Sequence, residues 1–75
     1  MKEILHDIVA AIIGEEARID IIEKEKDGMT VLELSVDKEN MGKVIGRKGK
    51  IAKAIRIVVK AYANKENKKV SVDII

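Results

Sequence analysis

The chain lacks several of the residue types that hold small proteins together. Its 75 residues include no cysteine and no proline, and His6 is the one histidine. No disulfide can form, and one histidine without cysteine argues against a structural zinc site. We therefore expect no metal ion and no cofactor. The absence of cysteine is compatible with a reducing cytosol.

Aromatic residues are almost absent as well, since Tyr62 is the one aromatic residue. Hydrophobic residues make up 47% of the chain and are almost all aliphatic. A chain of this size buries roughly 60% of its unfolded surface, so we expect one domain, residues 1–75, whose small core would benefit from association. No apolar run is long enough for a membrane span or a secretory signal, so we expect no membrane partner.

Charge is distributed unevenly along the chain, although the formal net charge is only +2. Residues 1–40 contain five basic and eleven acidic residues, whereas residues 41–65 contain eight basic residues and no acidic one. A basic segment in an otherwise acidic small domain predicts a polyanion as the ligand. An enzyme is not expected, because cysteine is absent, His6 has no convincing catalytic partner and the carboxylates are scattered. No small-molecule substrate follows from the sequence.

The first half of the chain has helical and then strand periodicity. Apolar residues recur at helical spacing over residues 2–13, and Gly14 is a natural stop. Apolar and polar residues then alternate over 18–26 and 29–36. Asp27-Gly28 between these strands predicts a two-residue hairpin loop, because both residues tolerate positive φ. This loop sets a register in which Ile19 faces Val36 and Ile21 faces Leu34.

The second half predicts a short helix, a glycine-containing loop, a long helix and a strand. The short helix covers about residues 37–45, with Asp37 as the expected N-cap. The long helix covers about 50–64, and a strand follows over 69–75. At roughly 100° per residue, the core-facing side of the long helix is expected to carry Ile51, Ile55, Val58, Val59 and Tyr62. Its opposite side carries the basic residues Lys53, Arg56 and Lys60. A small apolar strip of Ala54, Ile57 and Ala61 lies beside these basic residues.

The element order is therefore α-β-β-α-α-β. It predicts an α+β fold of two layers, in which a three-stranded sheet carries the helices on one face.

The segment from Val44 to Ile51 has the features of a binding loop. Gly46 and Gly49 carry no side chain, so an extended ligand can lie against the backbone. The long helix begins here, and the free amides and positive dipole end of that helix face the loop. Arg47 and Lys48 add charge between the glycines. Such a loop suits a phosphodiester backbone.

These residues resemble the loop signature of the KH domain, an apolar pair followed by Gly-x-x-Gly, one further residue and isoleucine. The element order is similar to the type II KH arrangement. The runs 37–46, 49–56 and 66–70 resemble the small single-KH proteins of bacteria, the KhpA family, and the resemblance covers essentially the whole chain. It implies a cytoplasmic RNA-binding protein of low sequence specificity that acts as an RNA chaperone or post-transcriptional regulator. It also implies a homodimer, or a heterodimer with a second, larger KH protein.

The resemblance also implies roles for individual residues. Gly46 and Gly49 would be the loop glycines, Arg47 and Lys48 the phosphate contacts, and Val44, Ile45 and Ile51 the lining of the groove or of the core beneath it. Charge and position add the candidate RNA contacts Lys43, Lys50, Lys53 and Arg56. KH loops of this kind clamp about four nucleotides. We expect single-stranded RNA as the ligand.

Two other functions fit the pattern. Two helices joined by a glycine-containing turn also describe a helix-turn-helix, which would bind duplex DNA. The strip of Ala54, Ile57 and Ala61 could instead pack against a partner helix, which would make the chain a protein–protein assembly module.

Overall fold

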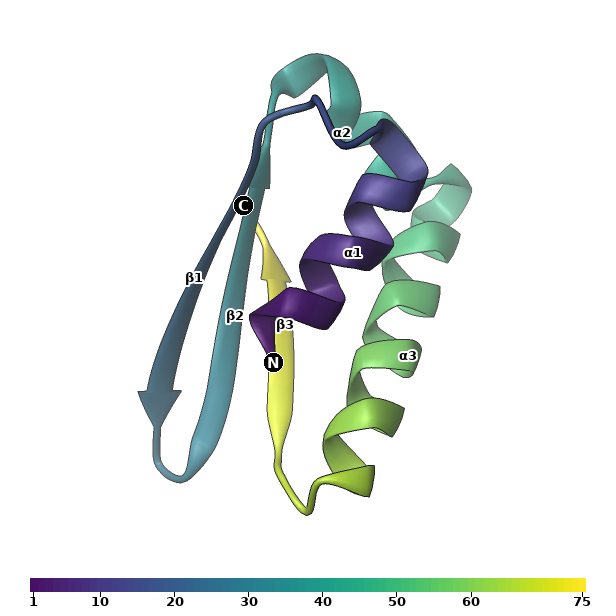
Figure 1. Ribbon diagram of the computed structural model, residues 1–75. Helices are drawn as coiled ribbons and strands as arrows, with labels where there is room; N and C mark the ends of the chain where they lie inside the picture. The colour runs from purple at the N-terminus through teal and green to yellow at the C-terminus, as the bar shows by residue number, and fades with distance from the viewer.

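The structure, a computed structural model, describes all of residues 1–75 (Figure 1). The elements follow one another as α1 (Lys2–Ile13), β1 (Ile19–Lys26), β2 (Met29–Val36), α2 (Lys38–Ile45), the short 3-10 helix η1 (Arg47–Gly49), α3 (Lys50–Lys65) and β3 (Val70–Ile74). The predicted order α-β-β-α-α-β is confirmed, and Figure 1 shows the helices on one face of the sheet. No helix is both long and apolar enough to cross a membrane.

The hairpin of β1 and β2 has the predicted register. Ile19 pairs with Val36 and Ile21 with Leu34 in an antiparallel ladder that closes at Lys26 and Met29. Asp27 and Gly28 form the loop, and both have positive φ. The alternation places Leu32 and Leu34 in the core, because successive side chains of a strand point to opposite faces.

The third strand joins the other side of β2. The sheet order is β1-β2-β3, and β3 runs parallel to β2. Parallel neighbours need a long crossover connection, which α2, η1 and α3 supply between them. The crossover therefore positions the glycine loop at one end of the molecule, where α2 meets α3.

One aliphatic core lies between the sheet and the helices. Its largest fully buried side chains are Leu5 and Val9 from α1, Leu32 and Leu34 from β2, Val44 from α2 and Val59 from α3. A single core of Leu, Ile, Val and Ala fits a sequence that has no cysteine and only one aromatic residue.

The predicted core face of α3 is wrong in part. Ile55 and Val59 are buried as predicted, but they are joined by Ala52 and Ala63. Ile51, Val58 and Tyr62 remain 37%, 47% and 41% exposed. The apolar arc of α3 is wider than the contact that the helix makes with the core. The two alanines allow a close approach to the neighbouring elements, and the larger side chains are left outside.

Asp37 occupies the predicted N-cap position of α2, but its side chain makes no capping hydrogen bond. Its carboxylate instead accepts a hydrogen bond from Arg18, the residue before β1. The capping prediction is therefore right in position and wrong in mechanism.

Candidate nucleic-acid interface

The loop between α2 and α3 has an unusual backbone. Gly46 (φ 75°) ends α2, and Gly49 (φ 74°, ψ 16°) is the left-handed residue from which α3 begins. Between them Lys48 also lies in the left-handed region, at φ 54° and ψ 27°. Three of four consecutive residues thus have positive φ, which reverses the chain within one short turn. The side chains of Arg47 and Lys48 are exposed on this turn.

Gly46 and Gly49 have different steric roles. A Cβ atom on Gly46 would clash with Cγ1 of Ile51 and would lie 2.9 Å from both the Cβ and the backbone nitrogen of Ile51. A Cβ atom on Gly49 would meet nothing within 4 Å. Gly46 therefore allows the first turn of α3 to pack against the end of α2, whereas Gly49 is needed for its φ and leaves open space above the loop.

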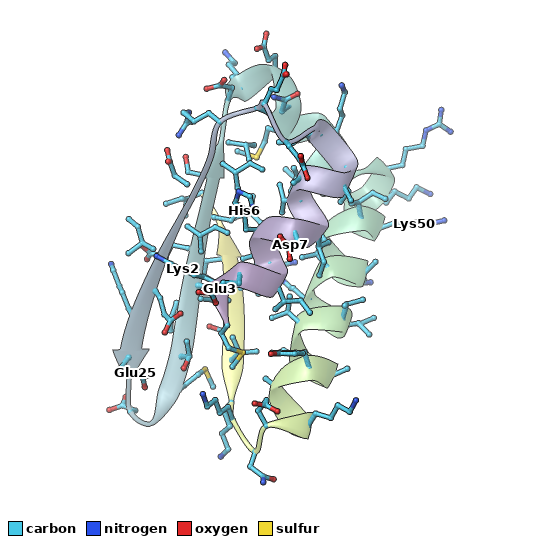
Figure 2. The ribbon with its side chains drawn as sticks, viewed as in Figure 1. Lys2, Glu3, His6, Asp7, Glu25 and Lys50 are labelled. Atoms are coloured by element: carbon cyan, nitrogen blue, oxygen red, sulfur yellow. The ribbon has the colours of Figure 1, made fainter.

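The basic residues around the loop have no acidic partners. The ion pairs of the structure involve the N-terminus, His6, Arg18 and Lys24, and none involves a basic residue of 41–65. Lys43, Lys50 and Lys53 are exposed, and Figure 2 shows Lys50 extending into solvent from the first turn of α3. Their charge is therefore available to an external anion at the amino end of a 16-residue helix.

The apolar candidates divide into two groups. Val44 is fully buried and belongs to the core, whereas Ile45 and Ile51 are 38% and 37% exposed on either side of the loop. Only these two isoleucines offer apolar surface to a ligand at the loop. The sequence left open whether the three residues line the groove or the core. In the structure Val44 lies in the core, and Ile45 and Ile51 lie at the surface beside the loop.

Arg56 is placed differently from the lysines. Its side chain is half-buried, and its Nε atom donates a 3.0 Å hydrogen bond to the carbonyl oxygen of Val72 in β3. Since β3 is an edge strand, this carbonyl has no strand partner on that side. Arg56 therefore links α3 to the sheet edge, and its guanidinium is less free than the exposed lysines.

A second group of basic residues lies at the other end of α3. The site predicted from the sequence did not include these residues. Lys60, Lys68 and Lys69 line a depression of about 210 Å³ together with Met29, Ala63, Asn64 and Val70. Lys68-Lys69 was visible in the sequence, but the acids Glu66 and Asp73 balance its charge locally. Only the fold brings this pair beside Lys60, in line with the basic side of α3.

Comparisons with known proteins identify a family and full-length relatives. The family described as "KhpA/KhpB, KH domain" matches residues 2–74. The RNA-binding protein KhpA of Clostridium perfringens is 49% identical over the full length of both chains. Proteins of the same name from Listeria monocytogenes and Borreliella burgdorferi are 41% and 40% identical, and the alignments cover 99% and 89% of those chains.

A solved structure shares the fold. The crystal structure of Aquifex aeolicus Era, bound to GDP and aluminium fluoride, superposes with a TM-score of 0.63 at 21% identity. The match covers 96% of this chain and 28% of the Era chain. At this identity the likeness concerns the fold alone.

Proposed function

The chain belongs to the KhpA/KhpB family of KH domains, and from this premise we propose that it binds single-stranded RNA through the loop Gly46–Gly49. The observation that carries the proposal is the loop itself. It combines a tight left-handed turn, open space above Gly49, two exposed basic side chains and the amino end of a helix. Phosphates accept hydrogen bonds from free helix amides and from Arg47 and Lys48.

The bases of the RNA lie beside the loop, against Ile45 and Ile51. Aliphatic side chains contact the face of any base and offer no hydrogen bonds that would distinguish one base from another. No aromatic side chain is near the loop, so the stacking used by many RNA-binding sheets is absent. Sequence specificity is therefore low, as suits an RNA chaperone or post-transcriptional regulator. Lys43, Lys50 and Lys53 contribute charge beside the loop, and Lys60, Lys68 and Lys69 continue it along α3.

The affinity of one domain is modest and depends strongly on salt. Each neutralised phosphate of a single strand contributes about −0.7 to the slope of log K against log salt concentration. About four nucleotides contact a loop of this type, which is a small footprint. A second domain held on the same RNA raises the effective affinity.

The exposed apolar side of α3 supplies a surface for that second domain. Ala54, Ile57, Val58, Ala61 and Tyr62 are all exposed and form one stripe along the helix. The small alanines allow close approach of another helix, and we propose a second copy of this chain as its occupant. A larger KH protein on the same stripe is the alternative partner. This stripe is also what favours the second candidate function, a protein–protein assembly module.

The test is fluorescence anisotropy with a labelled 12-nucleotide single-stranded RNA at two salt concentrations. The variant Arg47→Asp/Lys48→Asp is expected to abolish binding, because it reverses the charge on the loop. Aspartate tolerates the left-handed backbone at position 48, so the fold should persist, as circular dichroism can verify. The matched control, Lys26→Asp/Lys38→Asp, makes the same charge change at exposed positions away from the loop and should retain binding.

Three outcomes would contradict the proposal. A folded loop variant with unchanged RNA affinity excludes the loop as the site. Equal loss of binding in the control would mean that the net charge of the protein, and not the loop, accounts for the effect. Tighter binding of duplex DNA than of single-stranded RNA at matched salt favours the helix-turn-helix alternative.

A further inference from the structure

Strand β1 is a free edge of the sheet on the side of the molecule opposite α3. It pairs with β2 alone, and Figure 1 shows it at the outer left of the molecule, with α3 at the right. Every second residue of an antiparallel edge strand turns its backbone N–H and C=O away from its neighbour. Over the eight residues of β1 these groups are open to solvent or to another strand.

A cavity of about 370 Å³ lies between this strand and α1. Its lining consists of Lys2, Glu3, His6 and Asp7 from α1 and Ile19, Asp20 and Ile21 from β1. Figure 2 shows the four α1 residues on the part of the helix nearest β1. The volume falls within the range of about 300–1,000 Å³ that small-ligand pockets occupy. The half-buried Ile19 and Ile21 form its apolar floor.

The side chains of β1 that share the cavity face change from apolar to acidic along the strand. Residues 19, 21, 23 and 25 lie on one face, because side chains alternate, and they read Ile19, Ile21, Glu23, Glu25. Neither glutamate forms an ion pair; Glu25 accepts a hydrogen bond from Thr30. Asp7 adds an exposed carboxylate on the α1 side, beside His6.

Acidic residues on an edge strand have a general protective role. Two identical acidic edges repel each other, so the glutamates hinder pairing between two copies of β1. The same charges attract a basic strand. On this face of β1 the charge therefore disfavours pairing with a second copy of β1 and favours a positively charged strand. The two lysines of β1, Lys24 and Lys26, lie on its other face.

We propose that β1 and the cavity under α1 bind an extended, basic polypeptide segment, which adds to the sheet as an antiparallel strand. Backbone hydrogen bonds along β1 supply much of the affinity, as in other cases of strand addition. Two basic side chains of the segment face Glu25 and Glu23, and two aliphatic side chains enter the cavity over Ile21 and Ile19. The Glu23 and Glu25 part of the site shares a depression with Lys68 and Lys69, whereas none of the loop residues 46–49 lines this depression or the cavity under α1. The proposal does not depend on RNA binding at the loop.

The register of the strand defines a probe. The acetylated peptide Lys-Thr-Lys-Thr-Val-Thr-Val places its lysines opposite Glu25 and Glu23 and its valines opposite Ile21 and Ile19 when it runs antiparallel. Titration into the ¹⁵N-labelled chain should shift the amide signals of residues 19–25 and of His6, and should leave 46–49 unchanged. The peptide Glu-Thr-Glu-Thr-Val-Thr-Val and a peptide N-methylated at alternate residues should each bind at least tenfold more weakly.

A substitution in the protein provides a second, independent test of the proposal. Glu23→Lys should weaken the lysine peptide at least tenfold, and the matched control Asp73→Lys, an exposed acid on the opposite edge strand β3, should not. The amide spectra report whether each variant is folded. Shifts at 46–49 in place of 19–25, or equal binding of the N-methylated peptide, would overturn strand addition. Shifts at 19–25 that grow with protein concentration without peptide would assign the edge to a second copy of the chain and overturn the proposal too.

Discussion

Arg18 and Asp37 join two elements that lie far apart in the sequence. The Nε atom of Arg18, next to β1, donates a 2.8 Å hydrogen bond to Oδ1 of Asp37, at the start of α2. The same guanidinium also binds Asp20 through Nη1. The hydrogen bond that Arg18 donates to Asp37, and second the one it donates to Asp20, raise the pKa of Arg18 above its ordinary value. The link therefore joins the start of the hairpin to the start of α2, the helix that leads into the loop.

Arg18→Ala should lower the thermal midpoint, and Arg18→Lys should restore only part of it. Lysine keeps the charge but cannot bind two carboxylates with a planar fork. The loss should become smaller as salt is added, because both partners are exposed. Thermal denaturation followed by circular dichroism at two salt concentrations measures this. A loss independent of salt would contradict an ionic role.

Gly46→Ala should destabilise the fold more than Gly49→Ala. Both substitutions put an alanine at positive φ, which costs about 1–2 kcal/mol. Only Gly46→Ala also clashes with Ile51, and overpacking adds about 1–3 kcal/mol. Urea denaturation of the two variants gives the comparison. Equal losses would mean that Ile51 moves aside at little cost.

Arg56→Ala should reduce stability, whereas Lys53→Ala should change it little. The first variant removes the hydrogen bond to Val72 and leaves a carbonyl on the sheet edge without its partner, at about 1–3 kcal/mol. Exposed substitutions such as the second usually stay within about 0.5 kcal/mol. For RNA binding we expect the reverse ranking, with Lys53→Ala reducing the salt slope more. Denaturation and anisotropy on the same two variants test both statements.

Ile57→Glu should prevent self-association. Ile57 is 66% exposed in the centre of the apolar stripe of α3, so a charge there opposes burial against a second copy. The matched control is Ile22→Glu, since Ile22 is 53% exposed on the open face of the sheet. Sedimentation equilibrium should give a dimer for the native chain and the control, and a monomer for Ile57→Glu. Added salt should strengthen the dimer, because the stripe is flanked by lysines. A native chain that stays monomeric would contradict the proposed dimer and would favour a different protein as the partner of the stripe.

Glu3 should make a small contribution to the free energy of unfolding that is lost in acid. A hydrogen bond from its own backbone amide and, second, one from the N-terminal amine lower its pKa below the ordinary value of a glutamate. Because the folded-state pKa is lower than the unfolded one, the stabilisation is complete above the unfolded pKa. It is lost as pH falls through the folded pKa. N-terminal acetylation should raise the pKa of Glu3 part of the way, as an NMR titration of its side-chain carboxyl can show. An unchanged value would leave the backbone hydrogen bond and the charge of Lys2 as the causes.

The hairpin and the loop could be predicted from local sequence for the same reason. Asp27-Gly28 fixes the register of β1 and β2 through its turn, and the two-residue alternation then decides which side chains face the core. Gly46 and Gly49 likewise mark the turn between α2 and α3, because few residues other than glycine adopt positive φ easily. Both features depend on neighbours in the chain, so tertiary contacts were not needed to find them.

Tyr62, Arg56 and Lys68 show what the sequence did not determine. The apolar arc of α3 contains two possible core faces, and only packing against the sheet chose the one with Ala52 and Ala63, which left Tyr62 exposed. The bond from Arg56 to Val72 and the grouping of Lys68 with Lys60 join segments that only the crossover brings together. Local sequence determined the elements, the hairpin register and the loop, because turn chemistry and periodicity act over a few residues. The tertiary structure decided which side of each helix is free to bind, since that depends on how closely the layers pack.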